Sequence, residues 1–444
     1  MGRVWVENGL PPYVGAVENK TPGIFILNAI SYTLFGTNIF FMRTIGIISL
    51  VLASLLIFKI GKHLHSYTAG VFAMIIFGLT MSWRDMDGAF ASLTETFMIL
   101  FTVLSFYIVA KNSKNKNWRY YTIFAGISMG IAIAFKQIAI ITTAAIILYY
   151  IINNYKRGNI FGIVKGLFYI CSGIIIGTAI SMIPLWLSNV TINEYINGAW
   201  LILFDEGSTP SFINRFIFSR ELWLESRLDF FYPFLFLLVF QQNLLKKPFF
   251  IGLLIWLIFD FIGVNASGYY FGHQIKQLMP SLSIIIGILI ANSIQFYTDN
   301  VHEQAIYTKR ILIFTIVFLL PYNLIFDDYI QYKSKIFLHQ NRTVGRWLKD
   351  NSKSSDYLYF LCNANAVLSY SERVSSNKNF NPLFLNTDEE FEEVYIDLIN
   401  KTPKFIVRRK FNKWNFPKKL EDFVEQNYSL NNAQYDFLIY ERNQ

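Results

Sequence analysis

Long apolar segments recur along this chain from about residue 44 to residue 327. Several approach or exceed the roughly 18 apolar residues that a helix needs to cross a bilayer. Only 16% of the 444 residues are charged, against about 25% in soluble domains. The sequence therefore predicts an α-helical polytopic membrane protein with about ten crossings plus interfacial helices. The expected crossings are 44–60, 67–83, 95–110, 120–135, 138–154, 166–187, 229–243, 248–264, 278–295 and 311–327.

The apolar run at 23–40 differs from these crossings, because Asn28, Gly36 and Asn38 interrupt it. We expect a helical arm that lies at the membrane interface. After residue 328 the composition changes, and alternating segments predict strands mixed with helices in a small α/β domain. The expected strands are 356–362, 404–409 and 437–442, and the expected helices are 343–350, 388–400 and 417–427. We therefore divide the chain into a first-loop region (1–43), a transmembrane domain (44–327) and a C-terminal domain (328–444).

The basic residues indicate an orientation. Lys and Arg concentrate in the gaps at 111–119, 154–165, 246–247 and 309–310, which all fall on one side of the membrane under this count. Because basic loops stay cytoplasmic, the opposite loops, both termini and the C-terminal domain are expected outside. The net charge of +9 comes from these gaps and from a tail that mixes Lys and Arg with acids, so nucleic acid is not an expected partner.

The two cysteines, Cys171 in an apolar run and Cys362 in the polar tail, predict neither a disulfide nor a CxxC metal pair.

Carboxylates collect on the expected outer face. Glu18 lies near Lys20, Asp85 and Asp87 share a loop, and Glu95 begins an apolar segment. A carboxylate at a membrane boundary must face water, a cation or a protein cavity. A solvated helix N-terminus explains Glu95 equally well, since an acid suits the helix dipole there.

Cations lie on the same expected face. His273, Lys276 and Gln277 in "YFGHQIKQLMP" recur at helical spacing, which places them on one face just before a long apolar helix. Such a face suits a phosphate attached to a lipid. Two further cations are expected on the outer face: Lys136, between two crossings, and Arg43, at the first crossing. The alternative is that both are simply snorkelling side chains. A divalent metal held by Glu18 and His273 is a weak alternative, and no cofactor is firmly predicted.

Three motifs resemble the GT-C membrane glycosyltransferases, the class of the protein O-mannosyltransferases and the lipid A aminoarabinose transferase. "GLPPYVGAVENKTPGIFILNAISYTLFGTNIFFMR" is similar to the first outer loop of that class, and "SLTETFMIL" to its second-loop acid. "YYFGHQIKQLMPSLSIIIG" is similar to its His-containing loop before a "QLLP"-type helix. In the tail, "YSERV", "TPKFIV" and "YDFLIYER" fit the same pattern, so the resemblance covers nearly the whole chain.

The resemblance implies an enzyme that transfers a hexosyl or pentosyl group from a polyprenyl-phosphate donor to a hydroxyl of a lipid, glycan or protein acceptor. Mannosyl transfer and lipopolysaccharide modification are activities of the class. It further implies a bacterial plasma membrane, with the site and the C-terminal domain outside. The rival hypotheses are a transporter or flippase of lipid-linked sugars, for which Asp260 inside a crossing is the best support, and an inactive truncated copy.

The resemblance also assigns roles to the outer residues. Lys20 and His273 would contact the donor phosphate, and Glu95 would match the second-loop acid. Asp85, Asp87 or Glu95 would be the catalytic residue that substitutes for the base expected upstream of the first loop. The remaining candidates for phosphate binding are Gln277, Lys276, Arg43 and Lys136. The first helix and the acidic residue that precede this loop in the class have no counterpart before Met1, so we expect upstream coding sequence or a broken gene.

Overall fold

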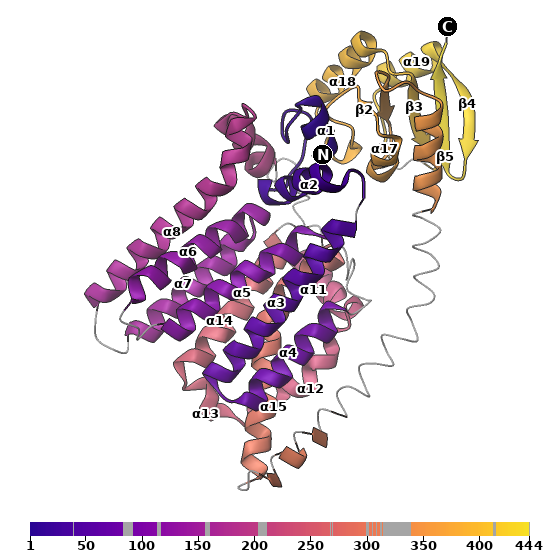
Figure 1. Cartoon of the computed structure of the whole chain (residues 1–444). Coiled ribbons are helices and arrows are strands. Elements are labelled where there is room, and N and C mark those ends of the chain that lie inside the picture. The colour runs from indigo at the N-terminus through magenta and orange to yellow at the C-terminus, as the bar shows by residue number, and fades with distance from the viewer. Residues whose placement is uncertain are drawn as a thin grey trace.

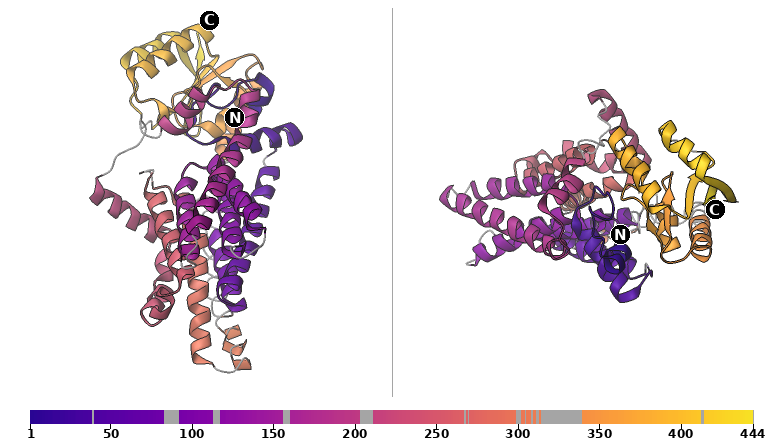
Figure 2. Two further views of the ribbon diagram at one scale, coloured as in Figure 1. Left: turned by 90° about the vertical axis from the view of Figure 1, so that its left-hand side faces the viewer. Right: turned by 90° about the horizontal axis from the view of Figure 1, so that it is seen from above.

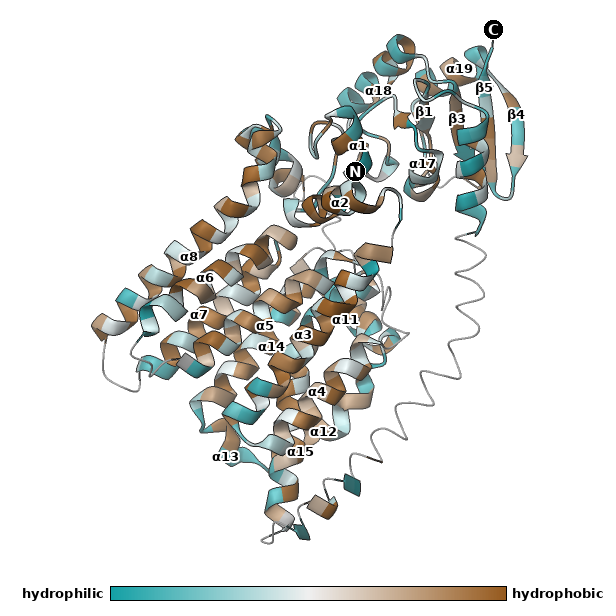
Figure 3. Cartoon of the chain, in the orientation of Figure 1, coloured by the Kyte–Doolittle hydropathy of each residue, from teal (hydrophilic) through white to brown (hydrophobic). Residues whose placement is uncertain are grey.

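The computed structural model describes residues 1–38, 40–82, 92–112, 117–155, 160–202, 211–266, 268, 270–298, 302–303, 305–307, 309–310, 313, 339–411 and 414–443. A bundle of apolar helices forms the body of the molecule, and a smaller domain with a sheet lies at one end of it (Figure 1). Hydrophobic side chains dominate the bundle, whereas the smaller domain mixes both kinds (Figure 3). The predicted fold class is confirmed.

Five helices among the described residues are long and apolar enough to cross a membrane. They are α3 (Phe40–Leu64), α5 (Thr94–Asn112), α8 (Ile160–Leu187), α14 (Pro248–Ala266) and the continuous run of η4 (Gly272–Leu278) with α15 (Met279–Tyr297). The shorter helices α4 (Tyr67–Met81), α6 (Trp118–Phe135) and α7 (Ala139–Tyr155) pack among them. These eight helices coincide with eight of the expected crossings.

The other two expected crossings differ. At 229–243 the chain forms short pieces instead of one helix: η2 (Leu228–Phe231), α12 (Tyr232–Phe236) and η3 (Leu237–Val239), followed by α13 (Gln242–Leu245). Pro233 is the second residue of α12, where it has no N–H to continue the hydrogen-bond ladder of the preceding turn. The expected crossing at 311–327 falls outside the described residues, apart from Ile313.

Helices α6 and α8 make a close pair through glycines spaced four residues apart. Gly126 and Gly130 of α6 face Gly173 and Gly177 of α8. A Cβ atom built on Gly126 would lie 2.2 Å from the carbonyl oxygen of Ile170, so only glycine permits this approach.

The expected interfacial arm is α2 (Pro22–Phe35). Pro22 fits its first turn, and Gly36, with φ of 62°, ends it. α1 (Gly2–Asn8) and α2 lie at the head of the bundle, next to the C-terminal domain (Figures 1 and 2). The remaining helices near this end are α9 (Ile192–Ile196), the π-helical turn η1 (Asn197–Leu201) and α11 (Phe212–Glu225).

The C-terminal domain holds a five-stranded sheet of order β2-β1-β3-β5-β4. β1 pairs in parallel with β2 and β3, whereas β5 pairs antiparallel with β3 and β4. The strands are β1 (Tyr357–Phe360), β2 (Val374–Ser375), β3 (Phe405–Arg409), β4 (Tyr428–Gln434) and β5 (Phe437–Arg442). The three expected strands are confirmed, and β2 and β4 were missed because one is two residues long and the other mostly polar.

Helices cover both faces of this sheet. Residues 339–350 and α17 (Asn365–Ser371) pack on one face, and α18 (Asp388–Lys401) and α19 (Lys418–Asn427) pack on the other. A short turn, η5 (Pro382–Phe384), precedes α18. Along β1, Leu358 and Phe360 enter the first core while Tyr359 enters the second, as the two-residue period of a strand requires.

Candidate active site

The carboxylate of Glu95 lies in the first turn of α5 and is 1% exposed. Lys136 donates a hydrogen bond from Nζ to its Oε1, and His273 Nε2 lies 3.6 Å from the same oxygen. Thr94 donates from Oγ1 to Oε2 at 2.9 Å. Three polar side chains from separate parts of the chain therefore surround one buried carboxylate.

Helix ends position the two cations. Lys136 follows the last residue of α6 in an extended conformation (φ −156°, ψ 129°), so the chain turns there into α7. His273 lies at the start of η4, and its ring stacks on that of Phe271 at a centroid distance of 5.6 Å. The side chains of Lys136 and His273 are 21% and 24% exposed, which leaves part of each available beyond Glu95.

The charges at this site favour an anion. One carboxylate faces an ammonium and an imidazole, so the group is positive whenever His273 is protonated. Phosphate oxygens form strong, charge-assisted hydrogen bonds with such cations. The sequence placed Glu95, Lys136 and His273 on one face of the membrane, and the structure joins them in a single cluster, which we call the Glu95 cluster.

Gln137 anchors the first loop beside the Glu95 cluster. Its Nε2 donates to the carbonyl oxygens of Asn19, at 2.6 Å, and Ala199. Lys20 follows Asn19 directly, forms an ion pair with Glu18 at 3.1 Å and is half exposed. Sequence reasoning missed Gln137, although the adjacent polar pair at 136–137, between two apolar helices, was a signal.

Tyr13 fixes the conformation of the same loop. Its hydroxyl donates to the carbonyl oxygen of Lys20 at 2.6 Å, and burial raises the pKa of Tyr13 well above its usual range. The phenol therefore stays protonated and remains a donor at physiological pH. Gly23 approaches the end of α6 so closely that an added Cβ would lie 2.7 Å from the carbonyl oxygen of Ala134.

Gln277 turns away from the Glu95 cluster. Its Nε2 lies 3.3 Å from both Asp260 Oδ1 and Thr142 Oγ1, and Thr142 donates to the same Asp260 oxygen at 2.5 Å. In the 3₁₀ geometry of η4 residues three apart align, so His273 and Lys276 share a row that excludes Gln277. Lys276 is fully buried.

The other sequence candidates lie apart from this cluster. Arg43 is exposed in the first turn of α3, and Asp85 and Asp87 lie outside the described residues. Among the residues that the structure describes, no three His, Cys, Asp or Glu side chains come together as a metal site. Glu18 and His273 each face a different partner, and the ammonium of Lys20 on Glu18 would repel a divalent cation.

Residues 19–186 match the model of the dolichyl-phosphate-mannose-protein mannosyltransferase family. The structure superposes on ArnT from Cupriavidus metallidurans bound to undecaprenyl phosphate with a TM-score of 0.65 and 11% identity, over 99% of this chain and 91% of that one. The resemblance to the GT-C glycosyltransferases is confirmed.

A second solved structure also has a fold similar to that of this chain. The oligosaccharyltransferase AglB from Archaeoglobus fulgidus, in complex with an inhibitory peptide and a dolichol-phosphate, gives a TM-score of 0.56 at 11% identity. The match covers 92% of this chain and 65% of AglB. The curated protein sequences gave no match. The chain is a multi-pass membrane protein with a GT-C fold.

Proposed function

We propose that this protein is a membrane glycosyltransferase that moves a sugar from a polyprenyl-phosphate donor to a hydroxyl acceptor. The observation that carries the proposal is the Glu95 cluster, where Lys136 and His273 converge on one carboxylate in the first turn of a membrane helix. Glu95 and Lys136 lie within the part of the chain that matches the mannosyltransferase family. The solved relatives named above carry undecaprenyl phosphate or dolichol-phosphate, which supports a lipid-linked phosphate as the donor.

The reaction needs charge stabilisation at the leaving group. The acceptor oxygen bonds to the anomeric carbon while the bond from that carbon to the phosphate oxygen breaks, and the phosphate keeps the electron pair. Lys136 and His273 stabilise the negative charge that grows there, and Lys20 adds a third cation from the adjoining loop. No acid has to protonate the phosphate, in contrast to glycoside hydrolysis.

The acceptor hydroxyl must lose its proton to a base. Both carboxylate oxygens of Glu95 are engaged, Oε1 by the two cations and Oε2 by Thr94. We therefore assign Glu95 to holding the cations in place. Asp85 and Asp87, eight to ten residues before it, are the proposed bases.

The site is proposed to face the outside of a bacterial plasma membrane. Lys62 and Lys111 lie in the last turns of α3 and α5, at the opposite end of α5 from Glu95. Because basic helix ends favour the cytoplasm, the Glu95 cluster and the C-terminal domain would lie outside. A transporter is not favoured, because Asp260, its best support, is occupied by Thr142 and Gln277.

A matched pair of lysine variants tests the function. Lys136→Met should lower transfer from radiolabelled undecaprenyl-phosphate sugars in membranes roughly ten- to hundredfold, the effect of losing one charge-assisted contact. Lys111→Met, which makes the same change at the far end of α5, should leave transfer unchanged. Equal activity of both variants, or the absence of transfer from every donor offered to the wild type, would overturn the proposal.

A further inference from the structure

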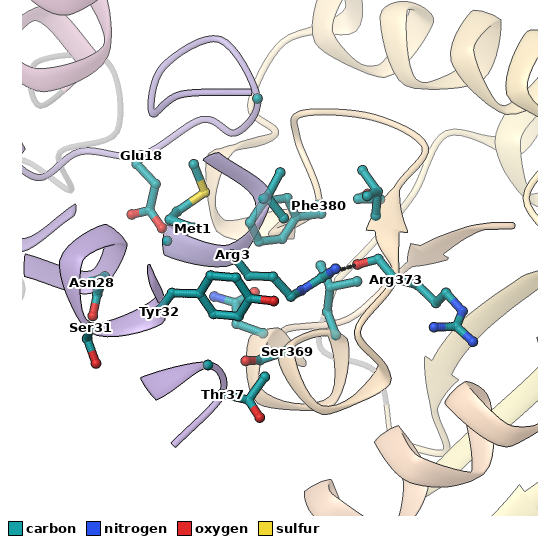
Figure 4. A pocket seen from close by; sticks show the side chains of 18 of the residues that line it. Met1, Arg3, Glu18, Asn28, Ser31, Tyr32, Thr37, Ser369, Arg373 and Phe380 are labelled. Carbon is teal, nitrogen blue, oxygen red and sulfur yellow. Dashed lines mark hydrogen bonds between the residues drawn. The ribbon is translucent and has the colours of Figure 1, made fainter. Parts of the chain in front are cut away.

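A cavity of about 320 Å³ lies between the first-loop region and the C-terminal domain. α1, α2 and the turn before α3 line one side of it, and α17 and β2 line the other (Figure 4). Its volume lies at the lower end of the ~300–1,000 Å³ typical of small-molecule sites. The cavity is separate from the Glu95 cluster, and the proposed function leaves it unused.

Two charged side chains that line the cavity, Glu18 and Arg3, are already paired with opposite charges. Glu18 forms an ion pair with Lys20 at 3.1 Å, and Arg3 pairs with Glu7 at 3.1 Å. Arg3 also donates from Nη2 to the carbonyl oxygen of Arg373 at 2.6 Å, a bond that joins the two walls (Figure 4). These two ion pairs therefore add little net charge to the wall that the first-loop region forms.

Arg373 contributes only its backbone to this bond. Its guanidinium points away from the cavity (Figure 4) and donates to the carbonyl oxygens of Lys349 and Ser352 at 2.8 and 2.6 Å.

Neutral hydrogen-bonding groups make up the rest of the polar lining. Asn28 and Thr37 line one wall, and Asn365 and Ser369, both exposed, line the other. The hydroxyl of Ser375 is buried and has no hydrogen-bond partner among the described residues.

Two aromatic rings, Tyr32 and Phe380, complete the walls. Burial and the hydrogen bond to Glu7 raise the pKa of Tyr32 to about 12, so its phenol stays neutral. Hydroxyls, amides and aromatic rings without net charge suit a polyhydroxylated, uncharged molecule.

Two short segments of the chain run from the cavity lining to residues beside the Glu95 cluster. Glu18 lines the cavity, and the next residue, Asn19, is held by Gln137 beside Lys136. Met42 lines the cavity floor, and one helical turn further along α3, Gly46 packs against Thr96, the neighbour of Glu95. Both connections place the cavity at the end of the bundle that carries the Glu95 cluster.

We propose that this cavity binds the acceptor as a neutral glycan and presents its hydroxyl to the donor. The inference rests on the proposed transferase function and selects a glycan from the lipid, glycan and protein acceptors. The donor phosphate is assigned to the Glu95 cluster instead, where two cations share one carboxylate, whereas Arg3 and Lys20 each have a carboxylate of their own.

Saturation-transfer NMR on the purified full chain tests this inference. The probes are the methyl glycosides of glucose, mannose, galactose and N-acetylglucosamine. At least one should receive magnetisation from the wild type. Ser369→Phe, which fills the cavity from an exposed position, should weaken that signal at least tenfold, and Asn365→Leu should weaken it less.

Ser355→Phe is the matched control, because Ser355 is also exposed in the C-terminal domain but does not line the cavity. It should bind the glycosides like the wild type, and undecaprenyl phosphate should bind all these variants equally. No signal from the wild type, or an undiminished signal in Ser369→Phe, would overturn the glycan site. The transferase proposal fails separately, if Lys136→Met and Lys111→Met transfer equally while glycosides still bind.

Discussion

At the scale of single residues, the site depends on one buried carboxylate that holds two cations. Glu95 is 1% exposed, and its oxygens meet Lys136, His273 and Thr94. Breaking a buried ion pair by removing one partner typically costs about 3–5 kcal/mol, because it leaves an uncompensated charge. Glu95 therefore determines both where the cations lie and how well this end of the bundle packs.

Neutralising Glu95 should impair the reaction more than the fold of the membrane domain. Glu95→Gln keeps the shape and the contact with Thr94 but releases Lys136 and His273, so we expect transfer to fall at least tenfold while the protein still inserts. Donor kinetics and membrane yield would be measured together. Glu389→Gln, the same change at an exposed position of α18, serves as the control. Near-normal turnover of Glu95→Gln would exclude a central role for this residue.

Substitutions of Asp260 test whether this residue serves as a hydrogen-bond acceptor or as a carboxylate needed for ion transport. Asn retains an oxygen that can accept from Thr142 and Gln277, whereas Leu removes the acceptor that both donors share. We expect Asp260→Asn to retain transfer and Asp260→Leu to lose stability in thermal unfolding. A complete loss of function in Asp260→Asn with unchanged stability would instead indicate that the carboxylate itself is needed, as in a transporter.

At the scale of elements, close helix contact rather than apolar burial holds α6 to α8, because lipid is as apolar as the helix surfaces. Gly126 and Gly130 on one helix and Gly173 and Gly177 on the other allow the backbones to meet. α6 ends at Lys136, so its placement determines where that cation lies.

A methyl group at this contact should destabilise the bundle. Gly126→Ala places a Cβ against the carbonyl oxygen of Ile170, and we expect a loss of about 1–3 kcal/mol, the usual cost of overpacking. The thermal midpoint in detergent would report it. Gly78→Ala is the matched control, since a Cβ there meets nothing within 4 Å. Equal midpoints for the two variants would show that α6 and α8 separate without cost.

At the scale of the whole molecule, the first loop joins the membrane bundle to the C-terminal domain. Arg3 donates to the carbonyl oxygen of Arg373, and the backbone N–H of Val17 donates to that of Lys378 at 3.1 Å. Gln137 anchors the same loop to the bundle. The C-terminal domain is thus held at the end of the bundle where the N-terminal region lies (Figure 2).

Cysteine labelling tests on which side of the membrane this end lies. A cysteine at Lys353 should react with a membrane-impermeant maleimide in intact cells, and one at Lys111 should not. The native thiols should give little background: burial raises the pKa of Cys362 to about 12, and Cys171 lies within the membrane helix α8. Only the thiolate reacts, so a raised pKa keeps Cys362 protonated and inert near pH 7. The opposite labelling would place the whole site on the cytoplasmic face.

The sequence by itself determined the features that depend on local pattern. Apolar length specified eight helices of the bundle, because transfer of each segment into lipid depends on its own side chains. Pro22 and Gly36 bounded α2 through their own backbone preferences. Alternation along 356–362 and 437–442 specified two strands. The glycosyltransferase resemblance also came from local motifs.

The tertiary structure alone decided which side chains meet. Lys136 and His273 reach Glu95 across 41 and 178 positions of the chain, whereas Lys20 pairs locally with Glu18. Gln277, expected beside His273, joins Asp260 because η4 is wound as a 3₁₀ helix. Periodicity gives the face of one helix but not the rotation and depth of its neighbours. The rotation and depth of neighbouring helices are set by backbone contacts such as those between the glycines of α6 and α8. The side-chain pairings across the bundle follow from these helix positions.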